Sequence, residues 1–156
     1  MRFAATLSAV LVAASVWAAL ATALPSSGAC TAGLSKIGGY QARTFCGPAK
    51  ATARVAGRSL RFAGGQCAIS QGYWTVNIGT IELGQPHKTK SYFGITLLKP
   101  SHADGTYRNV TFGFNVPGKS YLVSGGTLIL SKGGKAASFS GVAATGGGKV
   151  TGSVTC

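Results

Sequence analysis

The sequence predicts an all-β protein, an antiparallel β-sandwich or barrel of about eight short strands that follows a signal peptide and is stapled by disulfide bonds. From residue 51 onward, short runs of β-branched and aromatic residues alternate with glycine-containing breaks at regular spacing. No helical period follows the first apolar run, so strands are expected throughout. The 24 glycines have no fixed spacing, which disfavours a collagen-like or solenoid repeat.

The strongest strand pattern lies in residues 107–116. Val110, Phe112, Phe114 and Val116 recur in strict period two, so one face of this strand is expected to be buried. The other expected strands are 51–56, 59–63, a short strand through Cys67, 74–81, 92–98, 121–130, 135–144 and 149–156.

Residues 74–81 contain a second alternating pattern, with Trp74, Val76 and Ile78 on one candidate face. The pattern does not determine which residues from Gly79 to Ile81 belong to this face. Glycine pairs elsewhere have a clearer meaning, because Gly125-Gly126 interrupts a β-rich run and predicts a bulge or a bend.

Glycine and proline also mark the expected turns. Gly57 is expected to turn the first hairpin, and Pro117-Gly118 to end the strand that precedes it. The last two strands are expected to form a hairpin across Gly146-Gly147-Gly148.

The first 23 residues have the features of a secretory signal peptide. Met1-Arg2 supplies a positive charge, residues 3–20 form an apolar run, and Ala21-Thr22-Ala23 has the small-x-small pattern that signal peptidase prefers. Cleavage is therefore expected after Ala23, with an uncleaved membrane anchor as the alternative. The mature chain is expected to be secreted or to lie on the extracellular face of the cell envelope.

The mature chain is expected to contain one domain. Residues 24–50 are interpreted as an N-terminal segment, because Gly38-Gly39 and Gly47-Pro48 break it and it is too short for a domain of its own. Residues 51–156 are interpreted as the β domain.

The charge balance is strongly positive. The 156-residue chain has 15 lysine and arginine residues against two acidic ones, Glu82 and Asp104, for a formal net charge of +13, which loss of Arg2 with the signal lowers by one. Such a charge favours anionic partners, although solubility alone would also explain it. So few carboxylates argue against calcium or magnesium sites, and no cofactor is expected.

Four cysteines in an exported chain favour two disulfide bonds over free thiols. Three pairings are possible. Cys30 with Cys46 would staple the N-terminal segment, and Cys67 with Cys156 would close a loop of nearly the whole domain. No pair has the short ligand spacing of a zinc site, so no metal is expected.

Six basic residues lie between positions 36 and 61: Lys36, Arg43, Lys50, Arg54, Arg58 and Arg61. Arg54, Arg58 and Arg61 lie within one expected hairpin and are the candidate anion-binding residues, for teichoic acid, phospholipid headgroups or nucleic acid. A solvated face without a ligand is the alternative. Seven aromatic residues could stack on bases or sugars, although their places in strand patterns favour core packing: Tyr40, Phe45, Phe62, Tyr73, Trp74, Tyr92 and Phe93.

A catalytic site has weak support. The available acid and base residues would suit a metal-free ribonuclease, since a glutamate base, a histidine acid and a nearby cation can act on a phosphodiester. The chain lacks a nucleophile elbow and a Walker-type ending, and its histidines fall in expected loops, so no enzyme activity is expected. The residues of this alternative are Glu82, His87, Lys88, Lys90, His102, Asp104 and Arg108.

Two blocks carry a resemblance to a known family. The first runs from Ala51-Thr52-Ala53-Arg54 to Gly64-Gly65-Gln66-Cys67, and the second from Phe139-Ser140-Gly141-Val142 to Cys156. They resemble the mycobacterial LpqH-like lipoprotein-antigen family and related exported actinobacterial β domains. The resemblance implies a small β-rich envelope domain with an internal disulfide, a lipid-modified cysteine after the signal, and no enzyme activity.

The chain departs from that family at the lipid-attachment motif. Ser27-Gly28-Ala29-Cys30 has the small residues that precede the modified cysteine, but Ser27 stands where leucine is expected. Acylation of Cys30 would also leave three other cysteines, one of them unpaired. Cleavage after Ala23 is therefore expected in preference to lipid anchoring at Cys30.

Together these features predict an exported cell-envelope or secreted β domain without catalytic activity, whose basic surface binds anionic envelope polymers or lipids. A secreted cationic antimicrobial or host-interaction factor is the first alternative, and a small secreted ribonuclease is the second. Nucleic acid is a further candidate partner.

Overall fold

The computed structural model describes residues 29–84, 90–98, 103–145 and 147–156. The expected signal peptide and three residues of the ribonuclease alternative, His87, Lys88 and His102, lie outside these ranges. Among the described residues, no helix has the length and hydrophobicity needed to cross a membrane.

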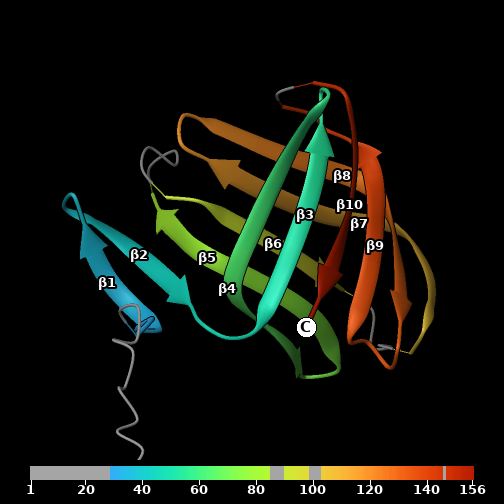
Figure 1. The fold of residues 1–156 in the computed structure, drawn as a ribbon, viewed down its shortest axis with the longest axis horizontal. Coiled ribbons are helices and arrows are strands. Elements are labelled where there is room, and N and C mark those ends of the chain that lie inside the picture. Colours follow the sequence, from blue (N-terminus) through green and yellow to red (C-terminus); the bar gives the residue numbers. More distant parts are fainter. Residues whose placement is uncertain (1–28, 85–89, 99–102, 146) are drawn as a thin grey trace, which may run out of the picture.

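The fold-class prediction is confirmed: the protein is all-β and antiparallel, with eight strands in a closed barrel and two further strands beside it (Figure 1). The described residues form ten strands where about eight were expected, because the N-terminal segment contributes two. The strands are β1 Gly33–Ile37, β2 Tyr40–Phe45, β3 Ala49–Val55, β4 Arg58–Ser70, β5 Tyr73–Leu83, β6 Tyr92–Leu97, β7 Gly105–Val116, β8 Lys119–Ser131, β9 Ala136–Val142 and β10 Lys149–Thr155.

The barrel is a meander in which each strand from β3 to β10 pairs with the next one along the chain. β10 returns to pair with β3, which closes the ring. Antiparallel neighbours need only short turns, and closure leaves no exposed edge along the paired strands.

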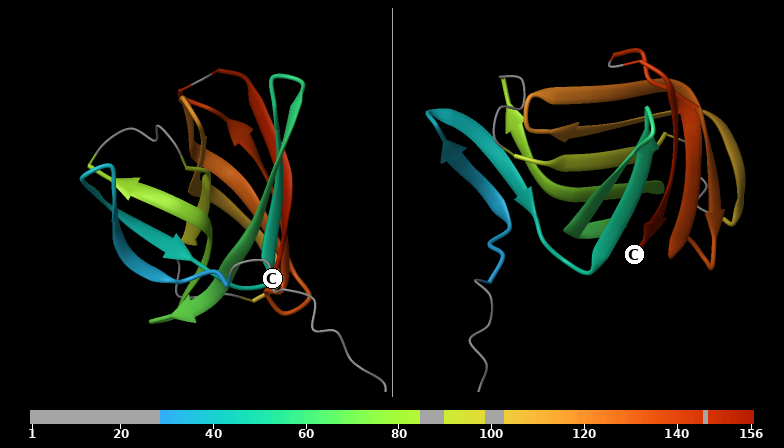
Figure 2. Two further views of the ribbon diagram at one scale, coloured as in Figure 1. Left: turned by 60° about the vertical axis from the view of Figure 1, so that its left-hand side comes forward. Right: turned by 45° about the horizontal axis from the view of Figure 1, so that its top comes forward.

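The β1–β2 hairpin lies outside the barrel wall, beside the far half of β5 (Figure 2). Residues 73–78 of β5 pair with β4, whereas residues 79–83 pair with β2. The exchange of partner occurs at Gly79, which has a φ of +85° that glycine adopts without strain. A side chain at Gly79 would also collide with the carbonyl oxygen of Ser91.

Alternation of inward and outward residues fills the barrel with side chains. β3 contributes small inward residues, Ala49, Ala51 and Ala53, and β10 contributes Gly152 between two valines. Rings from other strands occupy the space that this wall leaves; for example, a Cβ at Gly152 would collide with the Phe139 ring. The aromatic cluster consists of Phe62, Phe93, Phe112, Phe114, Tyr121 and Phe139.

Both disulfide bonds are present, Cys30–Cys46 and Cys67–Cys156. The first ties the N-terminal segment to the residue that follows β2, and the second joins β4 to the residue that follows β10. Of the three pairings left open by the sequence, the protein therefore uses the one that joins the first two cysteines over 16 positions and the last two over 89 positions. Disulfides are compatible with a secreted or extracellular protein.

Candidate functional site

The turn between β3 and β4 decides which basic side chains share a face. Ala56 and Gly57 both have positive φ, +47° and +75°, which is the type I′ geometry of a two-residue hairpin loop. The turn places Val55 opposite Arg58 and thereby sets the register of the whole hairpin. Since Val55 points into the core, Arg58 belongs to the inward set of β4 at the barrel rim.

The outward set of this hairpin carries three cations, Lys50 and Arg54 on β3 and Arg61 on β4, all exposed. Arg61 lies opposite Thr52, the residue midway between Lys50 and Arg54. Diagonal neighbours in an antiparallel pair are about 7–8 Å apart, so Arg61 forms a triangle with the other two. We call these residues and Lys149 the basic face.

Lys149 joins the triangle from β10. Arg54 lies opposite Thr151, and Lys149 is the next outward residue along β10, which makes it a diagonal neighbour of Arg54. Neither acidic residue of the chain lies on β3, β4 or β10. The cations therefore have no carboxylate partner on their own strands, and their mutual repulsion is a cost to the folded state.

Hydroxyl groups surround these cations on the same outer surface. The outward residues between and beside them on β3, β4, β9 and β10 are Thr52, Ser59, Ser138, Ser140, Thr151, Ser153 and Thr155. Cations that repel one another, set among hydroxyl donors on a rigid sheet, can bind phosphate or sulfate oxygens with charge-assisted hydrogen bonds.

The structure thus brings together Arg54 and Arg61 of the predicted triple and separates Arg58 from them. Two members of the face, Lys50 and Lys149, were not among the three candidate anion-binding residues, although Lys50 belongs to the same group of six basic residues. The period-two alternation from Ala49 to Val55 carries the signal for Lys50, because it puts Lys50, Thr52 and Arg54 in one phase. The position of Lys149 beside Arg54 depends on the β3–β10 pairing, which no local sequence pattern predicts.

The two acidic residues lie far from each other. The Asp104 carboxylate accepts hydrogen bonds from the backbone N–H groups of Gly133 and Gly134, at 3.0 and 3.1 Å. The Gly134 carbonyl accepts a bond from the Trp74 indole N–H at 2.9 Å. Glu82 is eight residues further along β5 than Trp74, or roughly 25 Å of extended strand. This separation argues against a shared site for the two carboxyl groups.

Asp104 therefore has a structural task at the β8–β9 turn. We expect Asp104→Ala to lower the free energy of unfolding by about 1 to 2 kcal/mol, because two backbone donors lose a charged acceptor at an exposed site. Asp104→Asn should cost less, since the amide oxygen still accepts one bond. Urea denaturation of the three proteins measures this, and equal stability of all three would contradict the role.

Metal binding has no support in the described part of the chain, where no three histidine, cysteine, aspartate or glutamate side chains come together. The described segments instead form a small disulfide-linked, up-and-down β-barrel with a packed interior and a basic outer face. A scan against protein-family models, a search of curated proteins and a search of solved structures each found no match to the chain. The resemblance to the lipoprotein-antigen family therefore stays a prediction.

Proposed function

We propose that the protein is an exported, non-catalytic binding domain whose basic face holds a phosphodiester-containing polymer of the cell envelope. The observation that carries the proposal is the triangle of Lys50, Arg54 and Arg61 on one rigid outer surface, set among hydroxyl side chains. The packed barrel interior supports an external site over an internal one. The sequence features of the first 23 residues support export.

The disulfide pattern bears on how the domain is held at the envelope. A Cys30 thiol that is bonded to Cys46 cannot also carry an acyl group. We therefore propose a secreted domain held by its polymer rather than a lipid-anchored one. Intact mass of the native protein distinguishes the two, since an acylated form would be heavier by its lipid and would retain one unpaired thiol.

Neutralising the triangle should weaken polymer binding. In the variant Lys50→Gln/Arg54→Gln/Arg61→Gln, affinity for poly(glycerol phosphate) should fall about 100-fold at low salt, at roughly 1 kcal/mol for each cation lost near an anionic surface. The slope of log affinity against log salt should decrease by about 2. Titration by calorimetry over a range of salt concentrations measures both quantities.

The matched control removes the same charge elsewhere. Lys119 at the start of β8 and Lys132 and Lys135 in the β8–β9 turn are exposed. Their substitution by glutamine should change affinity by less than about threefold. Lys149 is unsuitable as a control because it adjoins Arg54. Equal losses in both triple variants would reduce the basic face to a diffuse charge effect and contradict the proposal.

Two further measurements are needed. The first tests whether the face variant still folds, and the second tests whether the phosphate ligand belongs to a polymer or to a membrane. The face variant should be at least as stable as the native protein, since it relieves repulsion between neighbouring cations. Vesicles containing phosphatidylglycerol test the lipid source of phosphate. Stronger binding to vesicles than to the polymer, with release of their contents, would support the antimicrobial alternative instead.

A further inference from the structure

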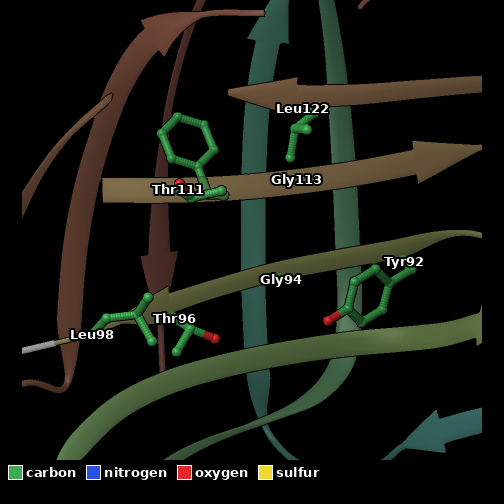
Figure 3. Close-up of a pocket in the computed structure, with 8 residues that line it drawn as sticks. Tyr92, Gly94, Thr96, Leu98, Thr111, Gly113 and Leu122 are labelled. Carbon is green, nitrogen blue, oxygen red and sulfur yellow. The ribbon is translucent and has the colours of Figure 1, made fainter. Parts of the chain in front are cut away.

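A second surface feature lies across the barrel from the basic face. It is an open hollow of about 310 Å³ on the outer side of β6, β7 and β8 (Figure 3). In the ring of eight strands, β7 is four strands away from β3, so the hollow and the basic face are on opposite sides. Its floor is the register pair Gly94 and Gly113, with Leu122 of β8 next to Gly113.

The backbone conformation does not require glycine at these two floor positions, because neither residue has a positive φ. At Gly94 the reason is the Tyr92 ring, whose atoms a Cβ would strike. At Gly113 a Cβ would be 3.2 Å from the Tyr121 carbonyl oxygen, which is tight but not excluded. Strand glycines of this kind mark places where another group approaches the backbone closely.

The Tyr92 ring covers Gly94 and forms a fixed aromatic surface beside the open floor at Gly113. Figure 3 shows its ring between β6 and β5, and its hydroxyl donates a 2.5 Å hydrogen bond to Asn77 Oδ1 on β5. The Phe45 ring packs 6.0 Å away, centroid to centroid. Burial raises the pKa of the Tyr92 hydroxyl, partly offset by the nearby Arg43, so the group remains a protonated donor at neutral pH.

The polar groups of the hollow are hydroxyls. Thr96 and Thr111 face each other as the next outward register pair beyond the glycines. Among the residues that the structure describes, no charged side chain lines the hollow, although the chain carries a net charge of +13. The site therefore favours an uncharged ligand that has both an apolar face and hydroxyl groups, which is the chemistry of a sugar ring.

A second hollow, of about 240 Å³, continues the first and shares Thr96, Leu98 and Thr111 with it. Arg108 and Asn109 add hydrogen-bond donors there. Asn109 has a φ of +59° at an irregularity in the β7–β8 pairing, which directs the local backbone out of regular strand geometry. The two hollows together form a groove long enough for more than one sugar.

We propose that this groove binds a neutral glycan, with one sugar ring stacked on Tyr92 and lying over Gly113 and its hydroxyls bonded to Thr96 and Thr111. Ligand sites typically combine a mostly apolar surface with a few placed polar groups, and the hollow has this character. An acyl chain fits less well, because the threonine pair interrupts the apolar wall between Leu122 and Leu98.

The test uses the full secreted chain at high salt, where binding to the basic face is screened and its failure cannot affect the result. The probes are three linear neutral hexasaccharides, maltohexaose, cellohexaose and mannohexaose. Amide NMR spectra should show saturable shifts at Gly94 and Gly113 with at least one of them. No shift with any of the three would overturn the proposal.

Substitutions then test the contributions of Tyr92 and Gly113 to glycan binding. Tyr92→Leu should weaken binding by at least about tenfold through loss of the stacking surface, whereas Tyr92→Phe should stay within about threefold. Gly113→Val fills the floor without touching the tyrosine and should also abolish binding. Tyr40→Leu, at a half-exposed tyrosine of the β1–β2 hairpin, is the matched control and should have no effect.

Chain length tests the second hollow. Asn109→Gly keeps the left-handed backbone and removes the amide, so it should weaken the hexasaccharide but not the corresponding disaccharide. Unchanged affinity in both Tyr92→Leu and Gly113→Val, with native spectra elsewhere, would contradict the site. Shifts of the same amides by monomeric decanoate, and not by glycans, would identify an acyl-chain groove and overturn the glycan proposal.

Discussion

Substitution of Cys67 or Cys156 by serine is expected to lower the free energy of unfolding by about 2 to 5 kcal/mol. The bond joins residues 89 positions apart in sequence, and the chain-entropy treatment gives about 4 to 5 kcal/mol for a loop of this length. That is a large share of the stability of a small domain, about 5 to 15 kcal/mol. Chemical denaturation under non-reducing conditions measures the change.

The partner substitutions provide the controls for this result. The Cys67→Ser/Cys156→Ser protein should be no less stable than either single variant, because one bond is lost in every case. Opening Cys30–Cys46, which spans 16 positions, should cost less, about 3 kcal/mol in the same treatment. A double variant much less stable than both single variants would show that the thiols contribute by packing.

Phe93→Ala is expected to destabilise the barrel by about 3 to 5 kcal/mol. The side chain is fully buried, and its ring contacts Phe62, Phe114 and Phe139 at centroid distances of 5.5, 6.2 and 5.2 Å. Its removal leaves a cavity. The surrounding strands cannot move in to close it, because each is hydrogen-bonded to a strand on both sides. Thermal and urea denaturation measure the loss.

Phe93→Leu separates the cavity from the loss of aromatic contacts. Leucine fills much of the volume, so this variant should lose about 1 to 2 kcal/mol. An exposed aromatic residue provides the second comparison: Tyr40→Ala, at a residue 48% exposed, should cost less than about 0.5 kcal/mol. If Phe93→Ala were as mild as Tyr40→Ala, the described core packing would be wrong.

Local alternation was sufficient to predict most barrel strands. Val110, Phe112 and Phe114 are all buried on β7, and Trp74, Val76 and Ile78 are buried on β5. The irregularity expected at Gly125-Gly126 is present, since Val110 pairs with Gly126 and Phe112 with Val123. Patterns of this kind reflect burial on one face, which each strand carries in its own residues.

Features that depend on distant partners were not predictable. No strand was assigned to the N-terminal segment, which was interpreted only as too short for a domain of its own, but β2 pairs with β5, whose residues follow it by more than 30 positions. The full basic face could not be predicted for the same reason, because Lys149 becomes a neighbour of Arg54 only through the β3–β10 pairing. Arg58 was grouped with Arg54 and Arg61 by sequence distance, whereas a two-residue turn puts it on the opposite face.

The partner exchange along β5 has a consequence for the order in which the chain becomes structured. β1 and β2 precede every other strand in sequence, yet β2 can dock only on the stretch 79–83 of β5. The hairpin therefore depends on the barrel, while no barrel ladder depends on the hairpin. Backbone amides of β1 and β2 should therefore exchange their hydrogens faster than those of the closed ring, because the hairpin can open while the barrel stays folded.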